Sequence, residues 1–332
     1  MRRTLDARHD RFPLRTPFRI ARGVKTAADV VSVTIGEGGM VGRGEGVPYP
    51  RYGETIDGAL AQIEAVRSLI EDGATRAEIA AALRAGAARN AVDCALWDLE
   101  ARLAGTSVSA LAGVRPVDAI ASAITIGIDT ADAMAGAASR AAQVPLLKIK
   151  VDRDGAADQI AAVRAVAPTP RLIVDPNESW RVEDIAARLP MLRAHRVDLL
   201  EQPVPAGEDA GLAALGGAIP ICADEALHTR ADLDRLAGLY SHVNVKLDKT
   251  GGLTEALALV AEARARGFGV MVGCMVCSSL GIAPAMLVAG GADFVDLDGP
   301  LWLAEDRPGG ARDHAGILTA PVPGFWGTHA CA

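Results

Sequence analysis

The stretch Leu146-Leu147-Lys148-Ile149-Lys150-Val151 is apolar and strand-like except for two lysines that stand two residues apart. Side chains alternate between the faces of a strand, so Lys148 and Lys150 share one face and the apolar residues take the other. Unpaired charge is costly to bury, so two amines on one side of a buried strand indicate a function. The alternative is an exposed edge strand that the lysines protect from aggregation. The residues downstream favour a functional site.

Composition excludes several classes of protein. The chain has 332 residues, enough for one large domain and a smaller one, and half of them are apolar. Its formal net charge of -7 argues against a nucleic-acid partner or an anionic membrane. Aromatic residues make up only 4%, which leaves few side chains for base stacking. We therefore expect a small-molecule partner.

Cysteine usage and hydropathy predict a cytoplasmic protein. The five cysteines are scattered along the chain: Cys94, Cys222, Cys274, Cys277 and Cys331. They include one C-x-x-C pair without a second pair, which argues against a zinc site and favours reduced thiols. The N-terminus lacks the apolar core of a signal peptide. Residues 267–292 carry no charge and could span a bilayer, but their glycines, serines and proline favour a buried strand, loop and helix.

From about residue 118, short apolar strand candidates alternate with alanine-rich helical segments. We predict eight such strands: Ala123–Ile128, Leu146–Val151, Arg171–Val174, Val197–Leu200, Ile219–Ala223, Val243–Leu247, Val270–Gly273 and Phe294–Leu297. Strict alternation of strand and helix predicts a parallel sheet, and eight units predict a closed (β/α)8-type barrel. A doubly wound open sheet would need a glycine-rich phosphate loop after an early strand, and the first strand has none. Residues 1–110 or so read as a smaller α+β unit.

Three carboxylates follow three successive strands, namely Asp175, Glu201 and Asp224. The strand ends of such a barrel converge at its mouth, where its chemistry lies. Clustered carboxylates repel one another unless a cation lies among them. Oxygen ligands without histidine or thiol indicate Mg²⁺, or Mn²⁺, rather than zinc. Any one of these acids could instead cap the helix that follows it.

Two lysines stand opposite each other in the predicted ring. Lys150 ends the second strand and Lys246 the sixth, so the amines face each other across the metal. This arrangement suits inversion at carbon, in which one amine removes a proton and the other returns one to the opposite face, while the metal stabilises an enediolate-like intermediate. Mg²⁺ and Lys148 would lower the pKa of Lys150. Alternatively, Lys246 only pairs with Asp224 or Asp248.

These motifs resemble the enolase superfamily, whose members pair a lysine or histidine base with Mg²⁺. Lys-x-Lys on the second strand, the three acids and the lysine on the sixth resemble its muconate-lactonising subgroup, along essentially the whole chain. The resemblance implies a modified (β/α)7β barrel with an N-terminal α+β capping domain. The implied domains are 1–115 for the cap, 116–310 for the barrel, and 311–332 for a C-terminal segment that returns to the cap.

Within the subgroup, the chain resembles the dipeptide epimerases of the L-Ala-D/L-Glu type, on the motif Asp296-Leu297-Asp298-Gly299-Pro300. Both carboxylates fall on one face of the strand end, and the resemblance implies that they hold the free ammonium of a dipeptide. A salt bridge to a loop arginine is the alternative. The run Asp175-Pro176-Asn177 differs from the more familiar Asp-Ala-Asn, a change that a strand end tolerates.

The resemblance also implies the remaining specificity residues. Thr16–Gly23 is similar to the first specificity loop of the family, where Arg22 could clamp a glutamate side chain. Arg51-Tyr52-Gly53 is similar to the second loop, which brings Tyr52 to the substrate. Thr125, Lys148 and Cys274 would line the carboxylate and peptide ends of the substrate, and Lys249 would play a supporting part.

We therefore expect an isomerase that uses one Mg²⁺ per subunit, with Mn²⁺ an option, and epimerises L-Ala-L-Glu to L-Ala-D-Glu. Lys150 and Lys246 would exchange the α-proton of the C-terminal residue. Another enzyme of the subgroup is the alternative, either a cycloisomerase, an o-succinylbenzoate synthase or an acylamino-acid racemase. A non-catalytic peptide-binding barrel is a further one. The resemblance also suggests recycling of cell-wall peptide, and it leaves a homo-oligomer open.

Overall fold

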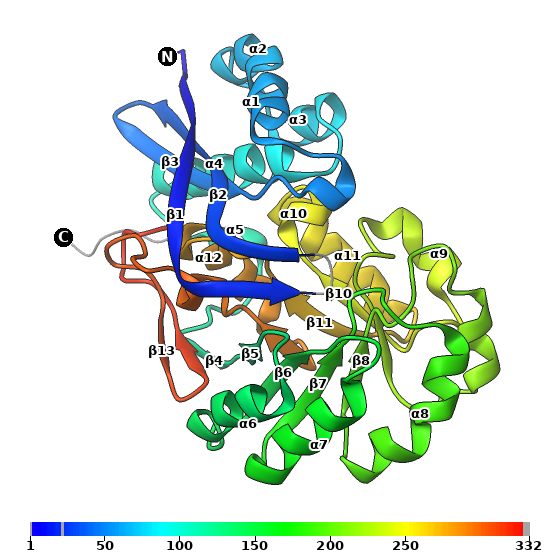
Figure 1. Cartoon of the computed structure of the whole chain (residues 1–332). Coiled ribbons are helices and arrows are strands. Elements are labelled where there is room, and N and C mark those ends of the chain that lie inside the picture. The colour runs from blue at the N-terminus through cyan, green and yellow to red at the C-terminus, as the bar shows by residue number, and fades with distance from the viewer. Residues whose placement is uncertain (1, 21–22, 328–332) are drawn as a thin grey trace.

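The computed structural model of the chain describes residues 2–20 and 23–327. Its centre is an eight-stranded parallel sheet in the order β12-β11-β10-β9-β8-β7-β6-β5 (Figure 1). These strands are β5 (Ile124–Ile126), β6 (Leu146–Lys150), β7 (Arg171–Asp175), β8 (Leu199–Glu201), β9 (Ile221–Ala223), β10 (His242–Val245), β11 (Gly269–Gly273) and β12 (Phe294–Asp296). The first and last strands approach each other where Ala123 N donates to Val295 O at 2.8 Å. The sheet is thus a nearly closed barrel, which confirms the predicted fold.

Helices surround the barrel and connect its strands. They are α6 (Ala131–Arg140), α7 (Ala156–Val166), α8 (Val182–Ala194), η2 (Ala210–Leu215), η3 (Arg230–Asp232), α9 (Leu233–Leu236), α10 (Leu247–Thr250), α11 (Leu253–Ala265), α12 (Ser279–Ala289) and η4 (Gly299–Trp302). Their apolar faces cover strands that are buried on both sides, as in other parallel sheets. Residues 267–292 fold into β11 and α12, as predicted. Among the described residues, no helix is long and apolar enough to cross a bilayer.

A smaller α+β unit covers one end of the barrel, coloured blue to cyan in Figure 1. It consists of β1 (Thr4–Ile20), β2 (Gly23–Glu37), β3 (Met40–Gly46), η1 (Pro50–Tyr52), α1 (Ile56–Ala65), α2 (Arg67–Glu71), α3 (Arg76–Ala82), α4 (Ala87–Leu103) and α5 (Val108–Ala112). The three strands form an antiparallel sheet in the order β1-β2-β3. Leu5, Val33 and Ile63 belong to a core cluster of this unit that is separate from the core of the barrel.

Helix α4 lies directly on β3 because three alternate residues of the strand are glycines. A Cβ atom at Gly42, Gly44 or Gly46 would lie 2.1 to 2.2 Å from a carbonyl oxygen of the helix. Those oxygens belong to Ala95, Ala91 and Ala87, one helical turn apart. Any larger residue at the three positions would push the helix off the strand.

Helix α4 also joins this unit to the barrel through buried polar contacts. Asn90 Nδ2 donates to Asp248 Oδ1 at 2.8 Å, and the hydroxyl of Thr254 donates to Asp93 Oδ1 at 2.6 Å. Asp248 belongs to α10, the short helix that begins directly after Lys246. The position of the cap over the mouth is therefore fixed close to a predicted catalytic residue.

A third, small sheet joins the C-terminal part of the chain to the barrel. It pairs β13 (Arg312–His314) with β14 (Ile317–Thr319), and β14 with β4 (Ala119–Ala121). Further along, Trp326 Nε1 donates to Arg43 O at 2.9 Å, which brings the segment to β3. Domain boundaries at residues 115/116 and 310/311 stay predictions.

Candidate active site

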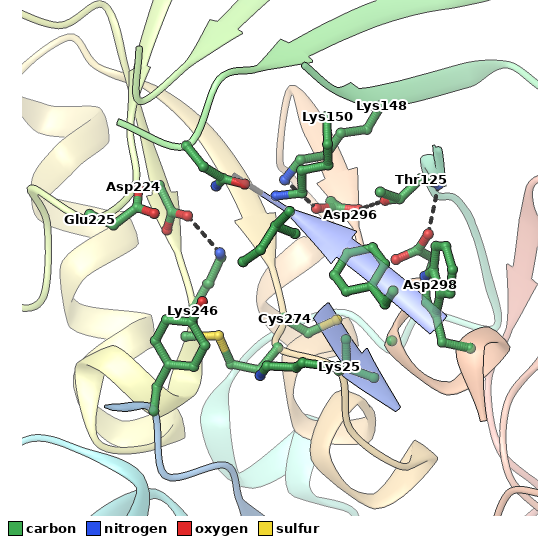
Figure 2. Close-up of a pocket in the computed structure, with 18 of the residues that line it drawn as sticks. Lys25, Thr125, Lys148, Lys150, Asp224, Glu225, Lys246, Cys274, Asp296 and Asp298 are labelled. Atoms are coloured by element: carbon green, nitrogen blue, oxygen red, sulfur yellow. Dashed lines mark hydrogen bonds and ion pairs between the residues drawn. The ribbon is translucent and has the colours of Figure 1, made fainter. Parts of the chain in front are cut away.

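A pocket of about 60 Å³ lies at the carboxyl ends of the barrel strands, under the cap (Figure 2). The barrel contributes Thr125, Lys148, Lys150, Asp224, Lys246, Cys274, Asp296 and Asp298, and the cap contributes Phe18, Ile20, Lys25, Tyr49 and Tyr52. Most of the residues predicted from the sequence thus converge on one cavity. Arg22 lies outside the described residues.

Of the three predicted metal ligands, Asp224 lines this pocket, and Asp175 and Glu201 lie beside Lys148, which also lines it. Asp175 and Glu201 are the last residues of β7 and β8, and Asp224 follows β9 directly. All three side chains are buried, with exposed fractions of 0%, 0% and 2%. Asn244 Nδ2 donates to Glu201 Oε1 at 2.9 Å, and the Gln202 amide oxygen accepts from Asp224 N at 2.8 Å. The barrel therefore fixes the Glu201 carboxylate and the backbone of Asp224 before any ligand binds.

Lys148 lies at the centre of the carboxylates. Its ammonium is 2.8 Å from Asp296 Oδ2, 2.8 Å from Glu201 Oε2 and 3.2 Å from Asp175 Oδ2. The side chain is only 2% exposed, so the edge-strand alternative is wrong for this residue. Burial opposes its charge, but attraction by Asp296, Glu201 and Asp175 holds the pKa of Lys148 well above its usual range.

Lys150 and Lys246 reach the pocket from strands four places apart in the ring of eight. Lys150 Nζ lies 2.6 Å from Asp175 Oδ2, and Lys246 Nζ lies 2.7 Å from Asp224 Oδ2, as Figure 2 shows for the second pair. Burial opposes the charge of Lys246, and Asp224 outweighs it and raises the pKa of the lysine. The pairing that was the alternative for Lys246 is thus present. It leaves the amine facing the pocket and is compatible with a catalytic role.

Lys249 contacts the same carboxylate from the other side. Its ammonium donates to Asp224 Oδ1 at 2.7 Å and to Asn244 O at 3.0 Å. Lys246 and Lys249 together hold the pKa of Asp224 well below its usual range, although burial acts in the opposite direction. Burial lowers the pKa of Lys249 itself. Lys249 therefore orients Asp224, in line with the supporting role expected for it.

The donor set suits a hard cation. Within residues 2–20 and 23–327, no three acidic, histidine or cysteine side chains form a metal site in their present positions. Lysine ammonium groups lie among the carboxylates instead. Glu201 Oε2 lies 2.8 Å from the Lys148 ammonium but receives no hydrogen bond, and burial raises the pKa of Glu201 to about 7. A divalent cation would give this buried oxygen a direct ligand contact, which oxygen ligands provide for Mg²⁺.

Asp296 and Asp298 line the same pocket, and both contact Thr125. The Thr125 hydroxyl donates to Asp296 Oδ1 at 3.2 Å, and Thr125 N donates to Asp298 Oδ2 at 2.7 Å (Figure 2). Burial, with repulsion from Asp296, raises the pKa of Asp298 to about 7. Of the described residues, no arginine forms an ion pair with either aspartate, so the loop-arginine alternative finds no support there.

The structure adds residues that sequence reasoning missed. Lys25, on β2, lines the pocket, and its ammonium lies 4.7 Å from the centre of the Tyr49 ring. No pattern in the sequence distinguished it from a solvated lysine. Asn244 stands two residues before Lys246, so strand alternation places both side chains on one face and could have identified it. Cys274 and Tyr52 also line the pocket, as expected.

Comparison with protein families agrees with this geometry. Residues 2–113 match the N-terminal domain of the mandelate racemase and muconate lactonizing enzymes, and residues 131–323 match the enolase C-terminal domain-like family. The chain therefore belongs to the family of mandelate racemase and muconate lactonizing enzymes, whose C-terminal domain is enolase-like.

Its relatives act on amino-acid derivatives. The chain is 49% identical over 306 residues to the L-Ala-D/L-Glu epimerase of Escherichia coli K12, covering 92% of this chain and 95% of the relative. It is 43% identical over 282 residues to an N-acetyl-D-glutamate racemase of a Pseudoalteromonas species, covering 84% and 89%. A solved enolase family member from Agrobacterium tumefaciens, with homology to dipeptide epimerases and with bound sodium and L-Ala-L-Glu, has a TM-score of 0.96. It is 47% identical, with 98% of this chain and 100% of that one covered.

Proposed function

We propose that the chain is a Mg²⁺-dependent dipeptide epimerase that converts L-Ala-L-Glu to L-Ala-D-Glu by two-base proton transfer. The observation that carries the proposal is the placement of Lys150 and Lys246 on opposite strands of one pocket that Asp296 and Asp298 also line. Two bases on opposite sides of the pocket suit inversion of configuration at one carbon. The paired aspartates suit the free ammonium of a dipeptide, which is two bonds away from the carbonyl carbon of the peptide group. The similarity to the E. coli epimerase supports the same substrate.

Each side chain has a defined task in this proposal. Asp175, Glu201 and Asp224 would hold the Mg²⁺, which supplies fixed positive charge beside the carboxylate of the substrate and so stabilises the deprotonated α-carbon. Lys150 takes the α-proton from the L isomer and Lys246 delivers a proton to the other face. In the reverse direction the two lysines exchange roles.

The ends of the substrate are bound by other groups. Lys148 neutralises the carboxylate of the C-terminal residue, with Thr125 and Cys274 beside it. Asp296 and Asp298 bind the free ammonium of the first residue. Lys25 offers a charge partner for a glutamate side chain, in addition to the predicted Arg22. One of the two interconverted dipeptides contains D-glutamate, so recycling of cell-wall peptide, in which that dipeptide would be consumed, is the physiological role that we propose.

Proton NMR in D₂O tests the function directly. L-Ala-L-Glu is incubated with the protein and Mg²⁺, and the glutamate α-proton is followed. Loss of that signal with growth of the L,D diastereomer is the expected result. Exchange without epimerisation would leave only one lysine competent, and no exchange in any of a panel of dipeptides would overturn the proposal.

The second candidate is an acylamino-acid racemase, favoured by the similarity to the N-acetyl-D-glutamate racemase. N-acetyl-glutamate carries no ammonium, so it brings no additional positive charge to the buried Asp296 and Asp298. We therefore expect L-Ala-L-Glu to exchange its α-proton faster than N-acetyl-L-glutamate under identical conditions. The opposite order would favour the racemase.

A further inference from the structure

Two cavities of very different size meet at two residues. The reaction pocket described above has a volume of about 60 Å³, and a neighbouring cleft has about 560 Å³. We call the second cavity the outer cleft; it lies between β1, the end of β5 and helix α6. Thr125 and Trp302 line both cavities. Trp302 therefore stands where the reaction pocket would otherwise continue into the outer cleft.

The indole of Trp302 is held in place from two directions. Its ring packs on Phe18 of β1, with ring centroids 4.4 Å apart and the planes inclined at 56°. The backbone after it is tied to the same strand, because Ala304 N donates to Pro13 O at 2.8 Å and the guanidinium of Arg15 donates to Leu303 O at 2.7 Å. A two-torsion aromatic side chain fixed in this way forms a rigid wall.

The position of this wall relative to the substrate follows from the proposed function, on which this inference rests. The ammonium that Asp298 binds sits on the same carbon as the side chain of the first residue. That side chain consequently lies close to the groups around Asp298, and Trp302 follows this aspartate by four residues on η4. We therefore expect a methyl group to fit beside the indole and a longer side chain to collide with it.

We propose that Trp302 limits the first residue of the dipeptide to a small side chain by closing the reaction pocket off from the outer cleft. The cleft beyond the indole is suited to an apolar side chain, since Ile124, Ile126 and Met134 contribute to its lining. Removal of the indole joins the two cavities. The enlarged site then accepts leucine or phenylalanine in first position.

The test compares kcat/KM for α-proton exchange in L-Ala-L-Glu and L-Leu-L-Glu, for the wild type and for Trp302→Ala. We expect the wild type to prefer the alanine dipeptide and the variant to raise the Leu/Ala ratio by about tenfold or more, the scale on which apolar pockets discriminate by size. Trp302→Phe retains an aromatic wall and should shift the ratio less. Trp302→Leu provides the same test if the alanine variant does not fold.

Leu301→Ala is the matched control, because this neighbour on η4 contributes to neither cavity lining. It should leave the ratio unchanged. Turnover of L-Ala-L-Glu by the wild type, together with an unchanged ratio in Trp302→Ala, would overturn the inference and leave the proposed function standing. A wild type that turns over both dipeptides equally well would also overturn the inference and leave the proposed function standing. If the wild type exchanges no proton in either dipeptide, the proposed function fails and the inference fails with it.

Discussion

Arg51 of the cap and Glu178 of the barrel form a bidentate ion pair, with Arg51 Nε 2.9 Å from Glu178 Oε2 and Arg51 Nη2 2.9 Å from Oε1. Glu178 is itself fixed, since its Oε1 also accepts from Ala206 N at 2.9 Å. Arg51 precedes Tyr52, whose ring lines the pocket and lies edge-on to His228 at 4.6 Å between centroids. The ion pair therefore holds one wall of the pocket in position.

Replacement of Arg51 by glutamine should raise KM for L-Ala-L-Glu about fivefold and change kcat little, because the loop carrying Tyr52 loses its anchor. Arg51 is exposed and Glu178 is largely buried, so the loss of substrate binding should be about 1 kcal/mol. Arg230→Gln is the control, since Arg230 forms a similar bidentate pair with Glu255 away from the pocket. Equal KM values for Arg51→Gln and the wild type would show that the loop does not depend on the ion pair.

The two lysines should be separable by isotope exchange. Lys246→Ala should lose epimerisation by about a thousandfold or more, the order expected for a catalytic acid or base, while the L,L dipeptide still exchanges its α-proton through Lys150. Lys150→Ala should exchange only the L,D dipeptide. The measurement is NMR in D₂O with each diastereomer separately. Loss of all exchange in both variants would instead indicate a structural role for the pairs with Asp175 and Asp224.

Binding of the dipeptide should strengthen as pH rises through about 7. Burial raises the pKa of Asp298 to about 7, so this carboxyl is neutral below that pH and negative above it. Only the negative form attracts an ammonium, whose own pKa near 8 sets the upper limit. We expect kcat/KM to increase between pH 6 and about 7.5. Asp298→Asn should flatten this part of the profile and lower kcat/KM; an unchanged slope would assign it to another group.

Addition of Mg²⁺ should raise the melting temperature without any substrate. A ligand at a hundred times its Kd stabilises the folded state by about 2.7 kcal/mol. Glu201→Gln should abolish the shift, because it removes the carboxylate whose oxygen lacks a hydrogen bond. Glu255→Gln, a change far from the pocket, should retain it. A shift of equal size in Glu201→Gln would place the cation elsewhere.

The junction of cap and barrel should lose stability as pH rises. Burial raises the pKa of Asp248 to about 7, although Val47 N and Asn90 Nδ2 donate hydrogen bonds to its Oδ1. The folded state thus binds more protons than the unfolded state between about pH 4 and 7, and unfolding becomes easier across that window. Asp248→Asn keeps the acceptor oxygen and should raise Tm at pH 8 by about 2 °C or more. An equal gain at pH 4 would point to a cause other than ionisation.

The barrel could be predicted from sequence because its signal is local. Each barrel strand is a short apolar run, and the structure places all eight within two residues of the expected ends. Strand β1 was not foreseen, since its burial alternates only weakly and arginines interrupt its apolar residues. The sheet of β4, β13 and β14 was missed as well, because it joins segments about two hundred residues apart.

The candidate site also has one part that local sequence predicts and another that depends on contacts between distant segments. Residues at strand ends, such as Lys150 and Asp224, could be placed from the spacing of the strands alone. The contact of Lys148 with Asp296 required closure of the ring, since the two residues lie on the second and last strands. Lys25 and Arg51 could not be ranked among the many exposed cations, because their surroundings are created only when the cap packs on the barrel.

The glycine contacts between β3 and α4 have a consequence for how such proteins diversify. Two residues of strand advance by about 6.6 Å and four residues of helix by about 6.0 Å, so the glycines and the helical carbonyls stay in step over three successive contacts. A one-residue insertion in either element would put the remaining contacts out of step. The loop after β3, which carries Tyr52, is under no such restriction. New substrate preferences can therefore arise by exchange of this loop while the glycine contacts and the barrel remain unchanged.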